Sequence, residues 1–121
     1  MAAITFVDSW KNSWVVAVWA YDKILEDVIT TVKDDPGLVQ QVERDLAFGA
    51  MNFQLIEREL GSRILAALKR AAEAIVKDES LPGMRWKERL DDEWIEKYQQ
   101  AVRELLELID RYEREVMKKE T

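Results

Sequence analysis

The sequence predicts an all-α protein, a bundle of three long helices that associates into oligomers. Its two prolines lie in the short breaks KDDPG (33–37) and ESLPG (79–83), which divide the chain into three segments rich in helix-forming residues. Within each segment, apolar residues recur at spacings of three and four, the period of an amphipathic helix. No stretch shows the strict alternation of a half-buried strand. At 121 residues, the chain is expected to form a single helical-bundle domain, 1–121.

The first segment predicts a helix from about residue 8 to residue 33, with Asp8 or Ser9 as its N-cap. Trp10 and Trp14 are expected to fill the core, because a large aromatic ring buries much apolar surface. The predicted core stripe of this helix comprises Trp14, Val18, Tyr21, Leu25, Val28 and Val32.

The second segment predicts a helix that begins with Asp35 as N-cap and Pro36 at the first helical position, where proline's missing N–H is tolerated. Gly49 and Gly61 are the expected kink or break points, because glycine costs about 1 kcal/mol relative to alanine inside a helix. The segment therefore forms either one long, bent helix or two helices, which would bring the total to four. Its stripe comprises Val39, Val42, Leu46, Phe53, Ile56, Leu60, Ile64, Leu68, Ala71 and Ile75.

The third segment shows the clearest helix signals. Leu90 and Ile95 flank Asp91 as in a hydrophobic staple around an N-cap. Glu93 and Lys97 are spaced to pair one turn apart on the outer face. The inner stripe comprises Trp94, Tyr98, Val102, Leu105, Ile109, Tyr112 and Val116.

Two apolar patches do not fit the stripes of these helices. Trp19 is rotated away from the first stripe, and the second segment is apolar on both faces between about residues 46 and 56. Either this stretch is a central helix wrapped by the others, or its second face meets another chain. Since exposed apolar patches usually mark interfaces, we expect association through Val16, Trp19, Ala20, Phe48, Met51 and Leu55.

The composition argues against catalysis. The chain contains no cysteine and no histidine, which removes thiolate nucleophiles and the commonest general base and transition-metal ligand. The stretch IERELGSRIL (56–65) resembles a metal-binding helix of the all-α nucleotide pyrophosphohydrolases, but Ser62 stands where that pattern requires an aspartate. We therefore expect Glu57 and Glu59 to be solvated, and we expect no enzymatic activity, cofactor or metal.

A short stretch could contact nucleic acid. MRWKERL (84–90) places Arg85, Lys87 and Arg89 around Trp86, and such cations can neutralise phosphates while the ring stacks on a base. The alternative is that Trp86 closes the open end of the bundle and the cations are solvated. Neighbouring acidic residues and a net charge of −6 favour this alternative.

These features predict a non-catalytic helical protein that self-associates or docks one protein partner. A second hypothesis is a helical subunit of a nucleoprotein assembly, such as a viral coat or an RNA-guided complex. A third is an acidic inhibitor or immunity protein, for which the net charge is the only argument. The longest apolar run, 14–21, is far shorter than the ~20 residues that span a bilayer, so no membrane association and a cytoplasmic location are expected.

Overall fold

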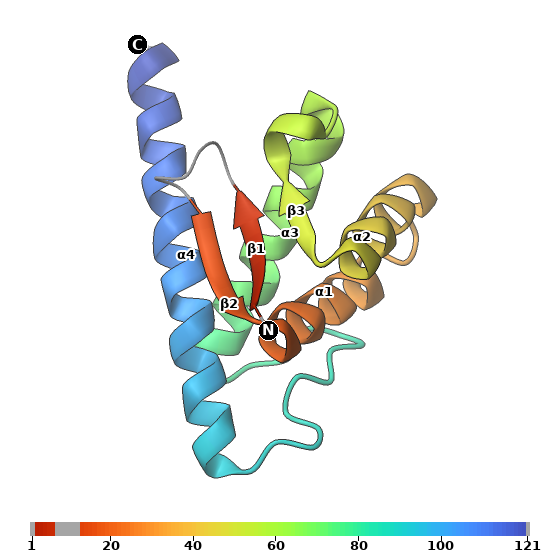
Figure 1. The fold of residues 1–121 in the computed structure, drawn as a ribbon, viewed down its shortest axis with the longest axis vertical. Helices are drawn as coiled ribbons and strands as arrows, with labels where there is room; N and C mark the ends of the chain where they lie inside the picture. Colours follow the sequence, from red (N-terminus) through yellow and green to blue (C-terminus); the bar gives the residue numbers. More distant parts are fainter. Residues whose placement is uncertain (1, 7–12, 121) are drawn as a thin grey trace.

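The computed structural model describes residues 2–6 and 13–120, and these form four α-helices and three short β-strands (Figure 1). The prediction of a mainly helical protein is confirmed, whereas the prediction that strands are absent is wrong. The elements in chain order are β1 (Ala2–Phe6), β2 (Ser13–Ala17), α1 (Val18–Thr31), α2 (Pro36–Phe48), β3 (Ala50–Asn52), the 3₁₀ turn η2 (Phe53–Leu55), α3 (Arg58–Val76) and α4 (Asp92–Glu120).

The strands form one sheet in the order β2-β1-β3. β1 is antiparallel to β2, with Ile4 opposite Val15, and parallel to β3, with Ile4 opposite Ala50. The sequence of β2, SWVVA, contains aromatic and β-branched residues, which fit a pleated surface once partner strands are present. The partners come from residues 2–6 and 50–52, which show no strand pattern of their own.

The first predicted helix begins ten residues later than expected, at Val18. Residues 13–17 pair with β1 instead of continuing the helix, because the sheet hydrogen bonds compete with the helical ones at this point. From Val18 onward the predicted stripe is correct, and Tyr21, Leu25 and Val28 are buried. Trp14 is buried as predicted, although from a strand, and its indole Nε1 donates to the carbonyl of Ala101 on α4 at 3.0 Å. The proposed caps Asp8 and Ser9, and Trp10, lie outside the described residues.

The second predicted segment is divided into α2 and α3, which is the alternative that gives four helices. Asp35 caps α2 by accepting from the amide of Leu38 at 3.3 Å, with Pro36 at the start, as predicted. The helix ends at Gly49, whose φ of 79° lies in the left-handed region that favours glycine. Gly61, the other expected break point, lies within α3.

The break at Gly49 also corrects the prediction of a helix that is apolar on both faces between residues 46 and 56. This stretch contains the end of α2, β3 and η2. Its apolar residues therefore follow the alternation of a strand and the geometry of a turn, not the two sides of one helix.

The helix α4 begins as the sequence predicts. Asp91 caps it by accepting from the amide of Trp94 at 3.0 Å. Glu93 pairs with Lys97 at 3.2 Å, the spacing expected for residues one turn apart. No helix within the described residues is long and apolar enough to cross a membrane.

The core lies where α1, α3, α4 and the inner face of the sheet meet. In Figure 1, α3 lies behind the strands, and α4 runs beside β2 along much of the molecule. The largest fully buried side chains are Trp86, Tyr21, Tyr98, Ile24, Leu25, Met51, Ile64, Leu68, Ile75, Leu105, Ile109 and Val28. Because they come from both halves of the chain, these elements share one apolar core.

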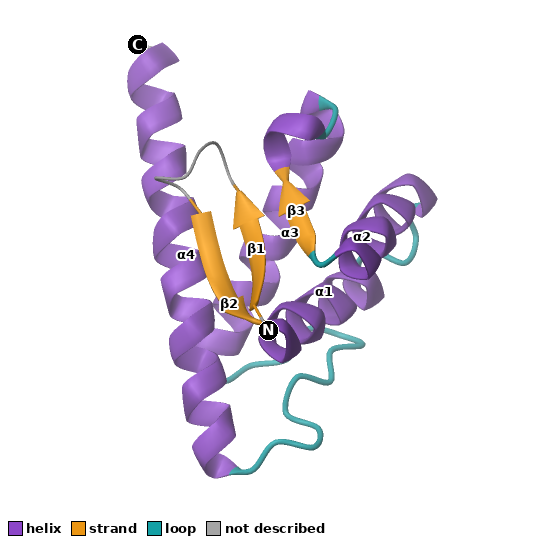
Figure 2. Ribbon diagram, viewed as in Figure 1, coloured by secondary structure: helices purple, strands orange, loops and turns teal. Residues whose placement is uncertain are grey.

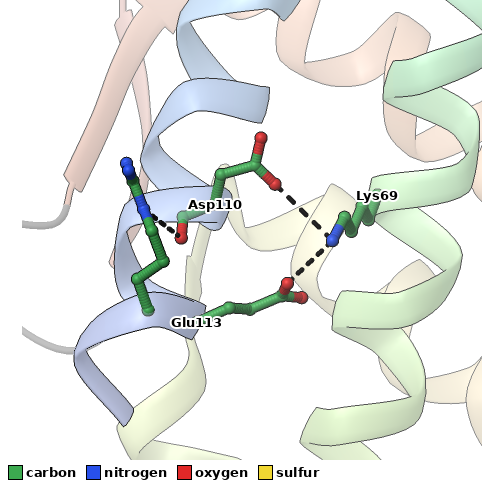
Figure 3. A network of polar contacts seen from close by, with 4 residues as sticks. Lys69, Asp110 and Glu113 are labelled. Atoms are coloured by element: carbon green, nitrogen blue, oxygen red, sulfur yellow. Dashed lines mark hydrogen bonds and ion pairs between the residues drawn. The ribbon is translucent and has the colours of Figure 1, made fainter. Parts of the chain in front are cut away.

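An ion-pair network joins α3 to α4 at the edge of this core (Figure 3). Lys69 extends from α3 between two acidic side chains of α4, with its Nζ 2.7 Å from Glu113 and 3.5 Å from Asp110. The hydrogen bond to Glu113 raises the pKa of Lys69, so the ammonium form is favoured. The network adds a polar contact between α3 and α4 to the apolar packing of the core.

Candidate interaction surface

Five large apolar side chains of the described residues are exposed to solvent. These are Val15 at 61%, Trp19 at 38%, Phe48 at 82%, Leu55 at 84% and Trp94 at 43% of their full surface. Scattered exposed apolar residues are normal, so their arrangement on the fold is what matters. Val15, Phe48 and Leu55 belong to or flank the sheet, whereas Trp19 and Trp94 lie at the starts of α1 and α4.

The sheet has one face in the core and one face that is open. Alternate residues of a strand point to opposite sides, and Trp14, Thr5 and Met51 are buried on the inner side. The neighbouring positions Val15 and Ala17 are exposed on the other side. In Figure 2, no described helix is drawn in front of the strands. We call this the open sheet face, defined by Ser13, Val15, Ala17, Ala50 and Asn52.

Phe48 and Leu55 flank β3 at its two ends. Phe48 is the last residue of α2, and the left-handed turn at Gly49 separates it from the strand. Leu55 is the last residue of η2, a turn that the side chain of Asn52 caps by accepting from the amide of Gln54 at 3.0 Å. Both turns place a large apolar side chain in solvent directly beside the sheet.

A groove begins next to Leu55. It has a volume of about 630 Å³ and lies between η2, the start of α3 and the C-terminal half of α4. Six of its ten lining residues are apolar, and the polar ones include Gln54, directly before Leu55. The apolar lining residues are Phe53, Ile56, Gly61, Leu65, Ala66 and Tyr112. Apolar surface thus continues from β3 toward α4.

The six residues that the sequence assigned to the interface differ in how exposed they are in the structure. Phe48 and Leu55 are exposed, and Trp19 is partly exposed. The assignment of Met51 and Ala20 is wrong, because they are 0% and 1% exposed and contribute to the core. Val16 lies on the inner side of β2 and is half-buried.

Two exposed residues escaped the sequence analysis. Val15 was placed on a helix, so its position in an alternating strand was not recognised. Trp94 was assigned to the inner stripe of α4, yet it lies against Trp19, with the ring centroids 5.6 Å apart in an edge-to-face arrangement. The Nζ of Lys97 also lies 4.6 Å from the centroid of the Trp94 ring. Trp19 and Trp94 therefore already have favourable contacts within their own chain.

The candidate nucleic-acid stretch adopts the alternative arrangement. Trp86 is 0% exposed, and its Nε1 donates to the carbonyl of Glu79 at 3.0 Å. Stacking of Trp86 on a base, the less favoured possibility, does not fit this burial, because the ring lies in the core against Tyr98. Lys87 forms an ion pair with Asp78, which lowers its availability for phosphate.

A charged cleft of about 600 Å³ between α1 and the 77–91 connection is lined by four basic residues, Lys23, Lys33, Arg85 and Arg89. Three acidic residues, Glu26, Asp27 and Glu88, line the same cleft. Asp27 is 5% exposed and accepts from the backbone amide of Arg85 at 3.0 Å. Burial raises the pKa of Asp27, and the Arg85 amide opposes that shift. The mixed charges make this cleft a poor match for a polyanion.

The glutamates of the IERELGSRIL stretch have a structural role. Glu57 is the N-cap of α3, where its carboxylate accepts from the amides of Glu59 and Leu60 at 3.1 and 3.0 Å. These hydrogen bonds lower the pKa of Glu57. Within the described part of the chain, no group of three or more acidic side chains is arranged to hold a metal ion.

Comparison with known proteins gives no relative from which a function could be inferred, so the exposed apolar surface described above is the basis for a proposal. No protein-family model, curated protein or solved structure matches the chain.

Proposed function

We propose that this protein is a non-catalytic interaction module that binds a protein chain through the open sheet face and its flanking residues Phe48 and Leu55. The observation that carries the proposal is the exposure of these two side chains, 82% and 84%, beside strands without a charged residue. The sequence pattern places Phe48 and Leu55 off the helical stripes, and both side chains are exposed, which supports the proposal.

The energetics favour a surface that becomes covered. Burying a fully exposed leucine or phenylalanine contributes about 1.5–3 kcal/mol. Most of that free energy would be gained only when a partner covers Phe48 and Leu55, because little of either side chain is in contact with its own chain. A few such anchors supply most of the affinity in a typical protein interface.

The alternative functions gain less support. Nucleic-acid binding through residues 84–90 loses its stacking ring, since Trp86 belongs to the core. The inhibitor hypothesis still depends on the net charge of −6 alone. The open sheet face supports binding to protein more than either of these.

The proposal can be tested by photo-crosslinking in the cells that make the protein. A benzophenone amino acid replaces Leu55 in one variant and the exposed Ser80 in a matched control. We expect light-dependent adducts of discrete mass from position 55 and none from position 80. The same experiment at Phe48 guards against a crosslinker that points away from the partner. Adducts absent from both 48 and 55 would overturn the proposal.

A further inference from the structure

We propose that the occupant of the open sheet face is a second copy of this chain, so that two sheets pack face to face in a symmetric dimer. This inference rests on the proposed function and specifies its partner. Three features of the described residues support it: the placement of the strand edges, the distribution of charge and the size of the side chains on the face.

The placement of the edges favours packing through the face over addition of a strand. α4 runs beside β2, and the indole of Trp14 binds the Ala101 carbonyl there at 3.0 Å (Figure 2). β3, at the other edge, is only three residues long and lies next to α2. An incoming strand needs a long, open edge, whereas a second sheet needs an open face.

The charge distribution permits two copies to meet at this face. Because each copy carries a net charge of −6, a self-interface must avoid placing acidic groups opposite one another. The strands β2 and β3 contain no charged residue. The densest acidic run, 91–96, begins α4 at the lower end of the molecule, whereas the strands lie beside the middle of that helix (Figure 1).

The rim of the face carries both signs of charge. A recess of about 320 Å³ between β2 and α4 is lined by Val15 together with Glu104, Glu107 and Arg111. In a two-fold arrangement, each rim contact occurs twice, with residue i of one copy facing residue j of the other. A rim that presents both acidic and basic groups can therefore complement itself.

The small side chains of the face suit close packing. Ala17 and Ala50 allow a second sheet to approach to the usual ~10 Å separation of packed sheets. A stable interface buries about 800 Å² per partner. Val15 on β2 and the residues Phe48 and Leu55 beside β3, present in both copies, supply apolar anchors at both edges of such an interface.

Sedimentation equilibrium of the purified full chain tests this inference. We expect a mass of about 28 kDa, twice the 14.2 kDa of one chain. Val15→Glu and Leu55→Glu should each raise the dissociation constant at least about tenfold, because a charge at a buried anchor opposes pairing. Ser80→Glu, which adds the same charge to an exposed position in the 77–91 connection, should leave it unchanged. Circular dichroism confirms that each variant is folded.

A chemical crosslink locates the contact independently of any destabilising charge. The chain has no cysteine, so Val15→Cys and the control Ser80→Cys each introduce a single thiol. A short bis-maleimide should join two copies through position 15 and not through position 80.

The outcomes separate this inference from the proposed function. A purified chain that stays monomeric at all concentrations, or a dimer that only the control changes weaken, would overturn the second copy as occupant. If position 55 then crosslinks to a different protein in cells, the proposed function stands without it. If neither position 48 nor position 55 gives an adduct, both fall.

Discussion

Two connections between helices, 49–57 and 77–91, differ in whether their large apolar side chains are buried or exposed. Each uses a glycine in the left-handed region, Gly49 with a φ of 79° and Gly83 with a φ of 91°. The 77–91 connection buries Trp86 and keeps its charged residues in solvent. The 49–57 connection buries Met51 but leaves Leu55 84% exposed.

The difference lies in how each connection is held by the rest of the chain. The 77–91 connection is bound to α1 through the Asp27 carboxylate and through Lys23, which donates to the Glu88 carbonyl at 3.2 Å. The 49–57 connection is held by the pairing of β3 with β1 and presents its remaining apolar surface outward. One connection completes the core, and the other offers a surface to a partner.

The largest expected effect comes from removing the ring that anchors the 77–91 connection. Trp86→Ala should lower the free energy of unfolding by about 3–5 kcal/mol, because it leaves a cavity in the core. Urea denaturation measures the loss. Trp94→Ala, at a residue 43% exposed, should cost clearly less, and equal losses would contradict the contrast between the buried and exposed rings.

The two glycines should respond to alanine by different amounts. At Gly83 a Cβ would lie 2.5 Å from Cγ2 of Thr30, so Gly83→Ala should cost about 2–4 kcal/mol from overpacking and backbone strain together. At Gly49 no atom lies within 4 Å of the new Cβ, and only the strain of about 1 kcal/mol is expected.

A double variant divides the Gly83 effect into its parts. Thr30→Ser removes the clashing methyl group and keeps the hydroxyl, which donates to the Glu26 carbonyl at 3.0 Å. Combined with Gly83→Ala, it should restore the overpacking part of the loss. If the stability losses of the two single variants simply add in the double variant, the contact with Thr30 is not the cause of the Gly83→Ala loss.

The carboxylate that holds the 77–91 connection should make stability depend on pH. Burial raises the folded-state pKa of Asp27, so the folded protein binds its proton more tightly than the unfolded chain. Stability is therefore lost as the pH rises from the unfolded pKa through the raised folded value. Asp27→Asn lacks this loss, and its stability relative to the native chain should improve between pH 3 and pH 7.

Urea midpoints of both proteins across that range provide the measurement. The asparagine retains an oxygen that can accept from the Arg85 amide, so the anchor itself is conserved. The half-buried Asp45, whose pKa desolvation also raises, is common to both proteins and cancels in the comparison. A difference that does not change with pH would show that burial of the charge is not the cause.

The smallest expected effect is at the exposed residue of the 49–57 connection. At low protein concentration, Leu55→Glu should change the free energy of unfolding by no more than about 0.5 kcal/mol, because the side chain contacts little of its own chain. The thermal midpoint of the native chain should rise with concentration as copies associate, and that of the variant should not. A large loss at low concentration would place Leu55 among the folding contacts instead.

The candidate surface was only partly predictable from the sequence. Phe48 and Leu55 were identified because they lie off the predicted helical stripe. Both side chains are exposed, although Leu55 lies in a turn and not in the predicted helix. Met51 was misassigned because, in a strand, it points opposite to its neighbours and into the core. Val15 was missed for the same reason, since its exposure depends on the strand that residues 13–17 form.

The sequence by itself determined the starts of α2 and α4 and the buried stripes of α3 and α4. The caps at Asp35 and Asp91 and these stripes depend on contacts within a few residues, which a local pattern records. The tertiary structure alone decided the sheet, because β1 and its parallel partner β3 are separated in the chain by β2, α1 and α2, a distance that no local pattern records. That pairing turned an apparent helix start into a strand and left one uncharged face open.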